Sequence, residues 1–188
     1  MTSNIMIVGV GGQGTLLASK LLGHLLLTMG YDVKVSEVHG MSQRGGSVVT
    51  YVRFGEKVYA PVIDKGQADY ILAFEALEAA RWLPFLRADG RLIVNTQQID
   101  PMPVVTGAAT YPEHLVEKLS SCADVDALDA LSLAEAAGSA KAVNLVLLGR
   151  LSRCFDFAEE IWLAAIRACV PSKFLEMNIK AFLAGRDC

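Results

Sequence analysis

The spacing of apolar residues changes from the period of a strand to that of a helix within the first third of the chain. An apolar run at residues 5–8 precedes a cluster of glycines, and residues 16–27 form an apolar, helix-forming stretch. Residues 33–38 then alternate as a strand does. We therefore predict a strand, a helix and a second strand, with the second strand paired parallel to the first through a right-handed crossover.

The next two β-rich runs predict a hairpin. Residues 47–54 and 57–62 are separated by Gly55 and Glu56, a short turn of the kind that joins antiparallel strands. A hairpin is an unusual insertion in a doubly wound sheet, so it counts against a plain dehydrogenase domain.

The rest of the chain returns to alternating strands and helices and ends in helices. Buried strands are predicted at 68–74 and 91–95 around a helix at 75–86, and residues 101–110 predict a connection that contains a short strand. A final strand at 125–131 follows, and the chain is predicted to be helical from residue 133. We predict one α/β domain over residues 1–188. Its Rossmann-like, mostly parallel sheet lies in a core at 1–132 with an inserted β-hairpin, and residues 133–188 form a helical C-terminal extension.

The glycines after the first strand form a G-x-G-x-x-G pattern between a strand and a helix. In such a loop Gly9 permits the turn, Gly11 lets a ligand approach the backbone, and Gly14 lets the helix pack close to the strand. The helix N-terminus favours an anion such as a phosphate. The candidate cofactor-binding residues are Gly9, Gly11, Gly12, Gln13 and Gly14. The alternative is a tight connection that binds no ligand.

A second polar segment follows the second strand, where ligands gather in open α/β sheets. Glu37 stands close to where a dinucleotide fold keeps an acid for the ribose, and His39 lies two residues beyond it, so both are catalytic candidates. Arg44 could bind a carboxylate or phosphate at two points. The candidate substrate or interface residues are Ser42, Gln43, Arg44, Gly45 and Gly46. Polar residues in loops are more often merely solvated.

Composition excludes several classes of function. Of the 188 residues 53% are hydrophobic and 20% charged, which suggests buried subunit contacts, and the net charge of −3 comes without a basic run for nucleic acid. Apolar stretches are too short to span a membrane and no secretory signal is visible, so we expect a cytoplasmic protein.

Four cysteines are widely separated, at positions 122, 154, 169 and 188. None forms a C-x-x-C pair, so we predict no metal site and no iron–sulfur cluster on this chain. The first three are predicted to be small buried hydrophobic residues in a reducing compartment.

Five segments together resemble a known family. GVGGQGTLLASKLLG, SEVHGMSQRGGSVVTYVRFG, PVIDKGQADYILAFEALEAAR, KAVNLVLLG and EMNIKAFLAG are similar to the gamma-type subunit or domain of the 2-oxoacid:ferredoxin oxidoreductases. Within that family, the EVHGMSQRGG form is most similar to the beta subunit of the indolepyruvate enzymes. The resemblance covers nearly the whole chain.

The resemblance implies a division of labour between subunits. In this family thiamine diphosphate attacks the 2-oxo acid, carbon dioxide leaves, electrons pass through [4Fe-4S] clusters to ferredoxin, and the acyl group goes to coenzyme A. Thiamine and clusters belong to the large alpha subunit. The chain is therefore expected to be inactive alone, to complete the active site of its partner, and to contact coenzyme A or the substrate carboxylate. The resemblance assigns no cofactor to this chain alone, and whether the glycine loop binds coenzyme A, a nucleotide or nothing stays open.

Two other interpretations stay open. One is a free-standing NAD- or FAD-binding oxidoreductase that uses the glycine loop and Glu37. The other is a non-catalytic scaffold module with an empty glycine loop. The sequence separates neither indolepyruvate from other 2-oxo acids nor one subunit stoichiometry from another.

Overall fold

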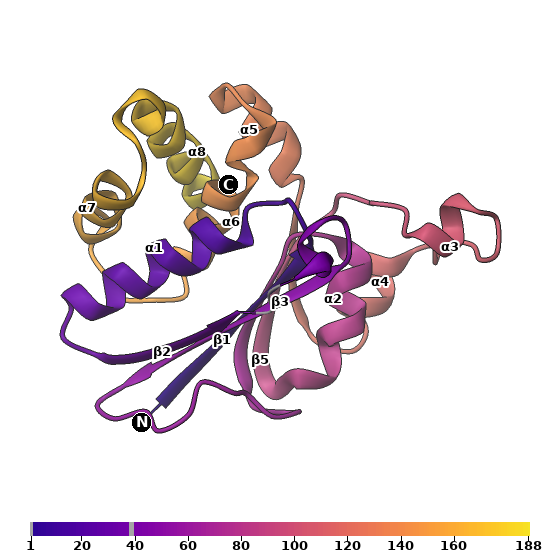
Figure 1. Ribbon diagram of the computed structural model, residues 1–188, viewed down its shortest axis with the longest axis horizontal. Coiled ribbons are helices and arrows are strands. Elements are labelled where there is room, and N and C mark those ends of the chain that lie inside the picture. Colours follow the sequence, from indigo (N-terminus) through magenta and orange to yellow (C-terminus); the bar gives the residue numbers. More distant parts are fainter. Residues whose placement is uncertain (1, 38–39) are drawn as a thin grey trace.

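One six-stranded sheet with helices on both faces forms the body of the protein (Figure 1). The computed structural model describes residues 2–37 and 40–188. The strand order is β2-β3-β1-β4-β5-β6. The strands are β1 (Thr2–Val10), β2 (Asp32–Glu37), β3 (Ser47–Gly55), β4 (Ala68–Ala73), β5 (Leu86–Asn95) and β6 (Asp124–Leu128).

The predicted fold class, α/β with a mostly parallel sheet, is confirmed. The pairs β1–β4, β4–β5 and β5–β6 are parallel, and β3 is antiparallel to both β1 and β2. The predicted direct pairing of the first two strands is wrong, because β3 lies between them. It fills that edge of β1 along its whole length, from Thr2 opposite Gly55 to Val10 opposite Ser47.

The predicted hairpin is half wrong. Its first arm is β3, but residues 57–62 form no strand. Both edges of β3 are already bonded, to β1 and to β2, so a second arm has no edge to pair with. The segment is held by side chains instead: the Arg53 guanidinium donates to the carbonyls of Ala60 and Val62, each at 2.9 Å.

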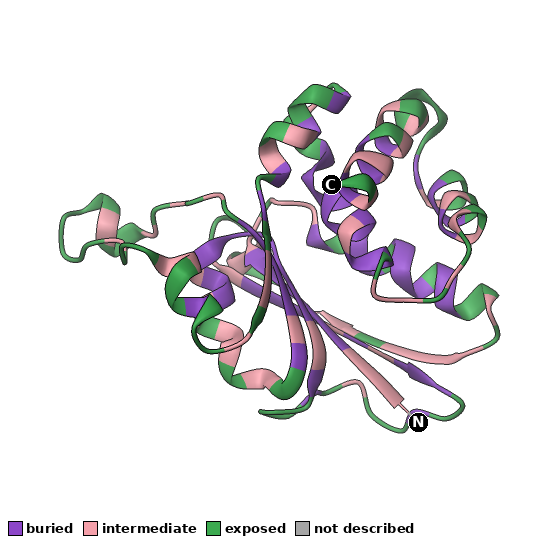
Figure 2. Ribbon diagram, turned by 180° about the vertical axis from the view of Figure 1, so that it is seen from behind, coloured by how far each residue is buried: buried purple, intermediate pink, exposed green. Residues whose placement is uncertain are grey.

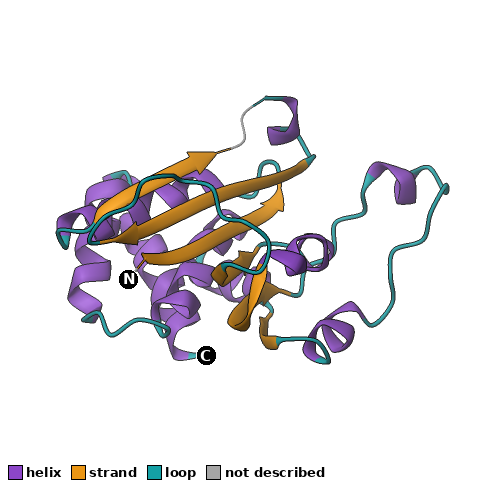
Figure 3. Ribbon diagram, turned by 90° about the horizontal axis from the view of Figure 1, so that it is seen from below, coloured by secondary structure: helices purple, strands orange, loops and turns teal. Residues whose placement is uncertain are grey.

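Helices cover the two faces unequally. Figure 1 shows α1 and α5 to α8 on one face and α2 with α4 on the other, and Figure 3 shows the same layers from below. The helices are α1 (Thr15–Thr28), α2 (Ala76–Trp82), α3 (Met102–Val105), α4 (Leu115–Ser120), α5 (Ala130–Ala137), α6 (Val143–Ser152), α7 (Glu159–Cys169) and α8 (Leu175–Asp187).

β1 is buried on both faces, which explains its continuous apolar run. Ile5 and Ile7 belong to the core on the α1 side, and Met6 and Val8 to the core on the α2 side; all four are fully buried. In Figure 2 the central strands and the inner faces of the helices are the buried parts of the molecule. None of the helices within the described residues is long and apolar enough to cross a membrane.

Residues 101–110 contain no strand, contrary to prediction. They contain the single helical turn α3, on an arm that projects from the body and is largely exposed (Figure 2). The arm is fixed at its base by the buried carboxylate of Glu75, which accepts hydrogen bonds from the Ile99 amide at 3.2 Å and from the Tyr111 hydroxyl. Burial and the neighbouring Glu75 raise the pKa of Tyr111, so the phenol stays protonated and donates this bond.

Two smaller predictions are also corrected. α2 ends at Trp82 and β5 begins at Leu86, because Leu83, Pro84 and Phe85 form a short 3₁₀ turn with Pro84 near its start. Cys122 is exposed instead of buried. Cys154 and Cys169 are partly buried, and burial raises the pKa of both thiols.

Two glycines let α6 and α8 cross in backbone contact. A Cβ on Gly149 would lie 2.0 Å from the carbonyl oxygen of Phe182, and one on Gly185 would lie 1.9 Å from that of Val146. Neither backbone atom can turn away as a side chain can, so any larger residue must push the helices apart.

We expect Gly149→Ala and Gly185→Ala each to lower the free energy of unfolding by about 3 kcal/mol or more. The matched control is Gly23→Ala in α1, where the new Cβ would lie 3.6 Å from Val35 Cγ2, an ordinary contact. That variant should be unchanged or up to about 1 kcal/mol more stable, because alanine favours a helix. Urea denaturation compares the three, and a Gly149→Ala variant as stable as the control would contradict the packing argument.

Candidate functional site

The glycine loop joins β1 to α1 at the carboxyl end of β1. Gly12 and Gly14 have φ angles of 103° and 88°, a left-handed region that other residues enter only with strain. At Gly9 a Cβ would lie 2.9 Å from Phe74 Cβ and from Gln13 Oε1. Gly12 and Gly14 therefore adopt the turn conformations that favour glycine, whereas Gly9 lies within β1 and leaves room for Phe74 and the Gln13 side chain.

Gly11 is approached by the protein's own chain. A Cβ at this position would lie 2.2 Å from the carbonyl oxygen of Ser42 and 2.4 Å from the carbonyl carbon of Gln43. The Gly11 amide donates a hydrogen bond of 2.8 Å to the carbonyl of Gly46. The space predicted for a ligand next to Gly11 is thus filled by the segment from Gly40 to Gly46, called the second loop below.

Gln13 turns its amide inward and ties strand ends together. Its Oε1 accepts a hydrogen bond of 2.8 Å from the Val10 amide, and its Nε2 donates one of 3.0 Å to the Phe74 carbonyl. The side chain thereby connects the carboxyl ends of β1 and β4. Both of these contacts are structural.

The second loop is compact and carries exposed side chains. Gly40 and Gly45 have φ angles of 114° and 92°, and the Gly46 amide donates to the Ser42 carbonyl at 2.9 Å. Met41 is 74% exposed. Arg44 is exposed, and its guanidinium makes no hydrogen bond or ion pair with any other residue that the structure describes. A cation and an apolar side chain therefore face outward together.

Glu37 does not lie beside the glycine loop. It ends β2 at the edge of the sheet and accepts a hydrogen bond of 2.6 Å from the hydroxyl of the buried Ser19 in α1. Because β3 intervenes, β2 is two strand spacings, about 10 Å, from β1. In a dinucleotide fold the ribose-binding acid follows the strand next to β1. His39, the other catalytic candidate, lies outside the described residues.

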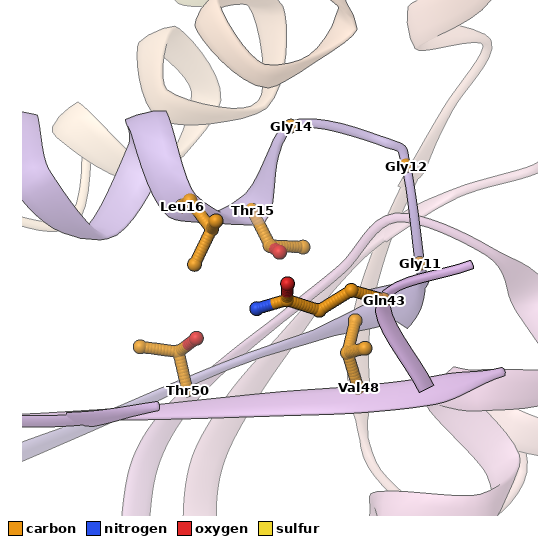
Figure 4. A pocket seen from close by; sticks show the side chains of 8 residues that line it. All are labelled: Gly11, Gly12, Gly14, Thr15, Leu16, Gln43, Val48 and Thr50. Carbon is orange, nitrogen blue, oxygen red and sulfur yellow. The ribbon is translucent and has the colours of Figure 1, made fainter. Parts of the chain in front are cut away.

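A cavity of about 260 Å³ opens between the two loops, α1 and β3. In Figure 4, Val48 and Thr50 point from β3 toward Thr15 and Leu16 of α1, and the amide of Gln43 extends into the space between them. The lining residues are Gly11, Gly12, Gly14, Thr15, Leu16, Gln43, Val48 and Thr50.

The chemistry of this cavity suits binding. The first turn of α1 contains no acidic residue, and the amides at the start of a helix attract a negative or polar group. Val48 and Leu16 supply an apolar wall. None of the lining residues that the structure describes is an acid, a base or a cysteine, so these side chains can hold a ligand but cannot transfer a proton to it.

A second cavity, of about 500 Å³, lies on the other side of the glycine loop. Its lining includes Gln97, which follows β5, and Lys141, which precedes α6. Next to it, the Asn144 amide donates to the Gly14 carbonyl at 3.3 Å. Reasoning from the sequence missed all three of these residues, although Lys141 and Asn144 stand in the KAVNLVLLG segment that carries the family resemblance.

Within residues 2–37 and 40–188, no three His, Cys, Asp or Glu side chains are grouped so that they could hold a metal ion. Two buried acidic side chains at the start of α2, Glu75 and Glu78, are instead bound to hydroxyl and amide groups. Glu75 caps α2 by accepting from the Glu78 amide at 2.8 Å, and Glu78 accepts from the Ser47 hydroxyl.

A full-length relative supports the resemblance found in the motifs. The indolepyruvate oxidoreductase subunit IorB of Thermococcus kodakarensis is 45% identical over 190 residues, which span 97% of this chain and 93% of the relative. The two proteins therefore match over nearly their full lengths.

Solved structures share the fold. The gamma subunit of a keto/oxoacid ferredoxin oxidoreductase from Geobacter sulfurreducens superimposes with a TM-score of 0.73 at 23% identity, over 98% of this chain and 96% of that one. A 2-oxoglutarate:ferredoxin oxidoreductase from Magnetococcus marinus gives 0.75 at 18% identity, over 99% of this chain but 30% of that one. In that protein the same fold is one part of a longer chain.

The family-level comparison extends over almost every residue. Residues 4–188 match the family described as pyruvate ferredoxin/flavodoxin oxidoreductase. Together with the 45% identity to a full-length relative, this match confirms the family that the motifs predicted. The chain belongs to the pyruvate ferredoxin/flavodoxin oxidoreductase family.

Proposed function

We propose that this chain is the small, non-thiamine subunit of an oxidoreductase that converts indolepyruvate or a similar arylpyruvate to an acyl-coenzyme A with ferredoxin as electron acceptor. The full-length similarity to a protein named as an indolepyruvate oxidoreductase subunit supports the choice of substrate. When bound to the large alpha subunit, thiamine diphosphate and [4Fe-4S] clusters would supply decarboxylation and electron transfer. We place the complex in the cytoplasm.

The observation that carries the proposal is the packing of the second loop on the glycine loop. The bond from the Gly11 amide to the Gly46 carbonyl joins two loops that leave Met41 and Arg44 exposed beside a small cavity. Such an edge suits contact with a second protein and with an anionic ligand. In our proposal this edge completes the active-site cavity of the large subunit.

Within that edge we assign roles by chemistry. Arg44 would bind the carboxylate of the 2-oxo acid or a phosphate of coenzyme A, because a guanidinium makes two parallel bonds to either group. The amide N–H groups around Gly12 and at the start of α1 would present the positive ends of their dipoles to the same anionic group. Ser42, Gln43, Gly45 and Gly46 would hold the loop against the substrate or the partner.

The geometry weighs against a free-standing dinucleotide-binding enzyme. The backbone of Ser42 and Gln43 fills the space beside Gly11, where a pyrophosphate would approach. Glu37 is separated from β1 by β3 and bonded to Ser19. A module that only assembles the complex remains the second candidate, and the experiments below separate it from the first.

Co-expression with the large alpha subunit of the same organism provides the first test. We expect coenzyme A-dependent oxidation of indolepyruvate by the co-purified complex, and little or none by either chain alone, because the cavity would be incomplete. Reduction of ferredoxin measured by absorbance reports the activity. Full activity of the large subunit alone would contradict the proposal.

A side chain at Gly11 should displace the second loop. Because its Cβ would meet the Ser42 carbonyl, Gly11→Ala should destabilise the protein by about 2 kcal/mol. It should also speed trypsin cleavage after Arg44 by about tenfold, since local opening exposes the loop. Mass spectrometry of a trypsin time course measures the cleavage.

Gly12→Ala is the matched control. Gly12 also has a φ angle that disfavours alanine, but apart from its two chain neighbours no described residue has an atom within 4 Å of its Cβ position. This variant should lose about 1–2 kcal/mol through strain while trypsin cleavage after Arg44 stays at the wild-type rate. Equal cleavage rates in both alanine variants would show that strain, not loop contact, is the cause.

The role of Arg44 is tested in the assembled complex. If its guanidinium binds an anionic ligand, Arg44→Ala should lower kcat/KM by at least about tenfold, equivalent to about 1.4 kcal/mol. Arg44→Lys should rescue little, because an ammonium group makes no planar two-point contact. Arg167→Ala, on the exposed face of α7, is the control and should behave as the wild type.

Subunit affinity is measured on the same variants. An Arg44→Ala variant that binds the large subunit weakly, but has normal kinetics when the partner is saturating, would assign Arg44 to the interface. A variant normal in both respects would remove Arg44 from the functional account.

A further inference from the structure

We infer that Glu78 is a positioning residue for the candidate site, although it lies on the opposite side of the sheet from the cavity. Through Ser47 it would hold the start of β3, and with it the second loop and one wall of the cavity. The expected effect of Glu78 on KM rests on the proposed function. Its expected effect on the position of the second loop rests only on hydrogen bonds within this chain.

Glu78 is a carboxylate in an apolar place. It is 4% exposed on α2, between Ala76 and Ala79, which pack against the sheet. Its Oε2 accepts hydrogen bonds from the Ser47 hydroxyl and, at 3.3 Å, from the Trp82 indole, and its Oε1 lies 3.2 Å from Arg81 Nε. Buried charge of this kind is retained in a stable protein only when it is fully bonded.

Ser47 is the point at which the second loop becomes β3. The residue before it, Gly46, accepts the hydrogen bond from the Gly11 amide, and Ser47 itself lies opposite Val10 in the sheet. One hydroxyl, bonded to Glu78 on the far face, thus lies next to the contact that joins the two loops.

Because side chains alternate along a strand, fixing Ser47 on one face of β3 fixes which side chains face the cavity on the other. Ser47 and Val49 face α2, where Val49 is part of the core, whereas Val48 and Thr50 face α1 and line the cavity. A shift of one residue at the start of β3 would exchange the two faces. The bond from Ser47 to Glu78 therefore favours the register in which Val48 and Thr50 point into the cavity, as in Figure 4.

The other contact of Glu78 supplies a control. Arg81 reaches the same carboxylate from solvent with a half-exposed side chain, and among the described residues it makes no bond to the second loop. If the loss of any contact to Glu78 disturbed the site, changing Arg81 would also raise KM. Opening of the second loop should follow from changing Glu78 or Ser47 and not from changing Arg81.

The experiment compares Ser47→Ala, Glu78→Gln, the double variant, Ser47→Thr and Arg81→Gln. In the assembled complex, Ser47→Ala and Glu78→Gln should each raise a KM, for the 2-oxo acid or for coenzyme A, by about fivefold while kcat stays within about twofold. The double variant should be no worse than Ser47→Ala, because Ser47→Ala removes the bond that Glu78→Gln weakens. Ser47→Thr, which keeps the hydroxyl, and Arg81→Gln should keep wild-type constants.

Hydrogen exchange gives a second measurement that needs no activity. In the full-length chain, the Gly11 amide should exchange about tenfold faster in Ser47→Ala and Glu78→Gln than in the wild type or Arg81→Gln, because its bond to Gly46 opens more often. Unchanged protection of Gly11 would overturn the positioning role.

The two measurements distinguish the possible failures. Faster exchange with unchanged KM, in a complex that needs this chain, would show that the loop is anchored but does not position the site, and would overturn the inference. If the large subunit proves fully active alone, the proposed function fails, and the exchange experiment still decides whether Glu78 holds the loop.

Discussion

The absence of a side chain at Gly11 is the constraint on which the architecture of the site depends. It lets the backbone of Ser42 and Gln43 approach to a distance that no Cβ would permit, and the Gly11 amide then bonds to the Gly46 carbonyl. β3 leaves that contact in register with β1 along its whole length. The antiparallel insertion, the position of the second loop and the cavity between the loops follow from this one approach.

Local sequence patterns predicted where individual strands and helices lie along the chain better than they predicted which of these elements contact one another. The apolar run before Gly9 predicted β1, and the glycines predicted the turn into α1, because both depend on residues close in the sequence. The partner of Gly11 could not be predicted, since Ser42 is distant in the sequence and no periodicity encodes which segment occupies a sheet edge. The same limit explains why the first two strands were expected to pair directly, although β3 lies between them.

Side-chain bonds account for other differences from prediction. Residues 57–62 have the composition of a strand but no free edge, so Arg53 holds their carbonyls. Glu75 and Glu78 stand in the segment FEALEAA, where spacing suggests only a helix, yet each carboxylate reaches another segment, 99–111 in one case and Ser47 in the other. The family resemblance identified the chain as a subunit, whereas these contacts required the structure.

The glycine pattern has a different use here from that in a dinucleotide-binding fold. Because Gly11 receives a segment of its own chain, the cavity of about 260 Å³ between the two loops offers a ligand Gly12, Gly14 and the first turn of α1. Pockets that enclose a whole drug-sized ligand span about 300–1,000 Å³, so this cavity suits one group of a larger molecule. The rest of a substrate or of coenzyme A would then need walls from another protein. That requirement, with Met41 and Arg44 exposed at the same edge, is why we propose a role in a complex over an independent enzyme.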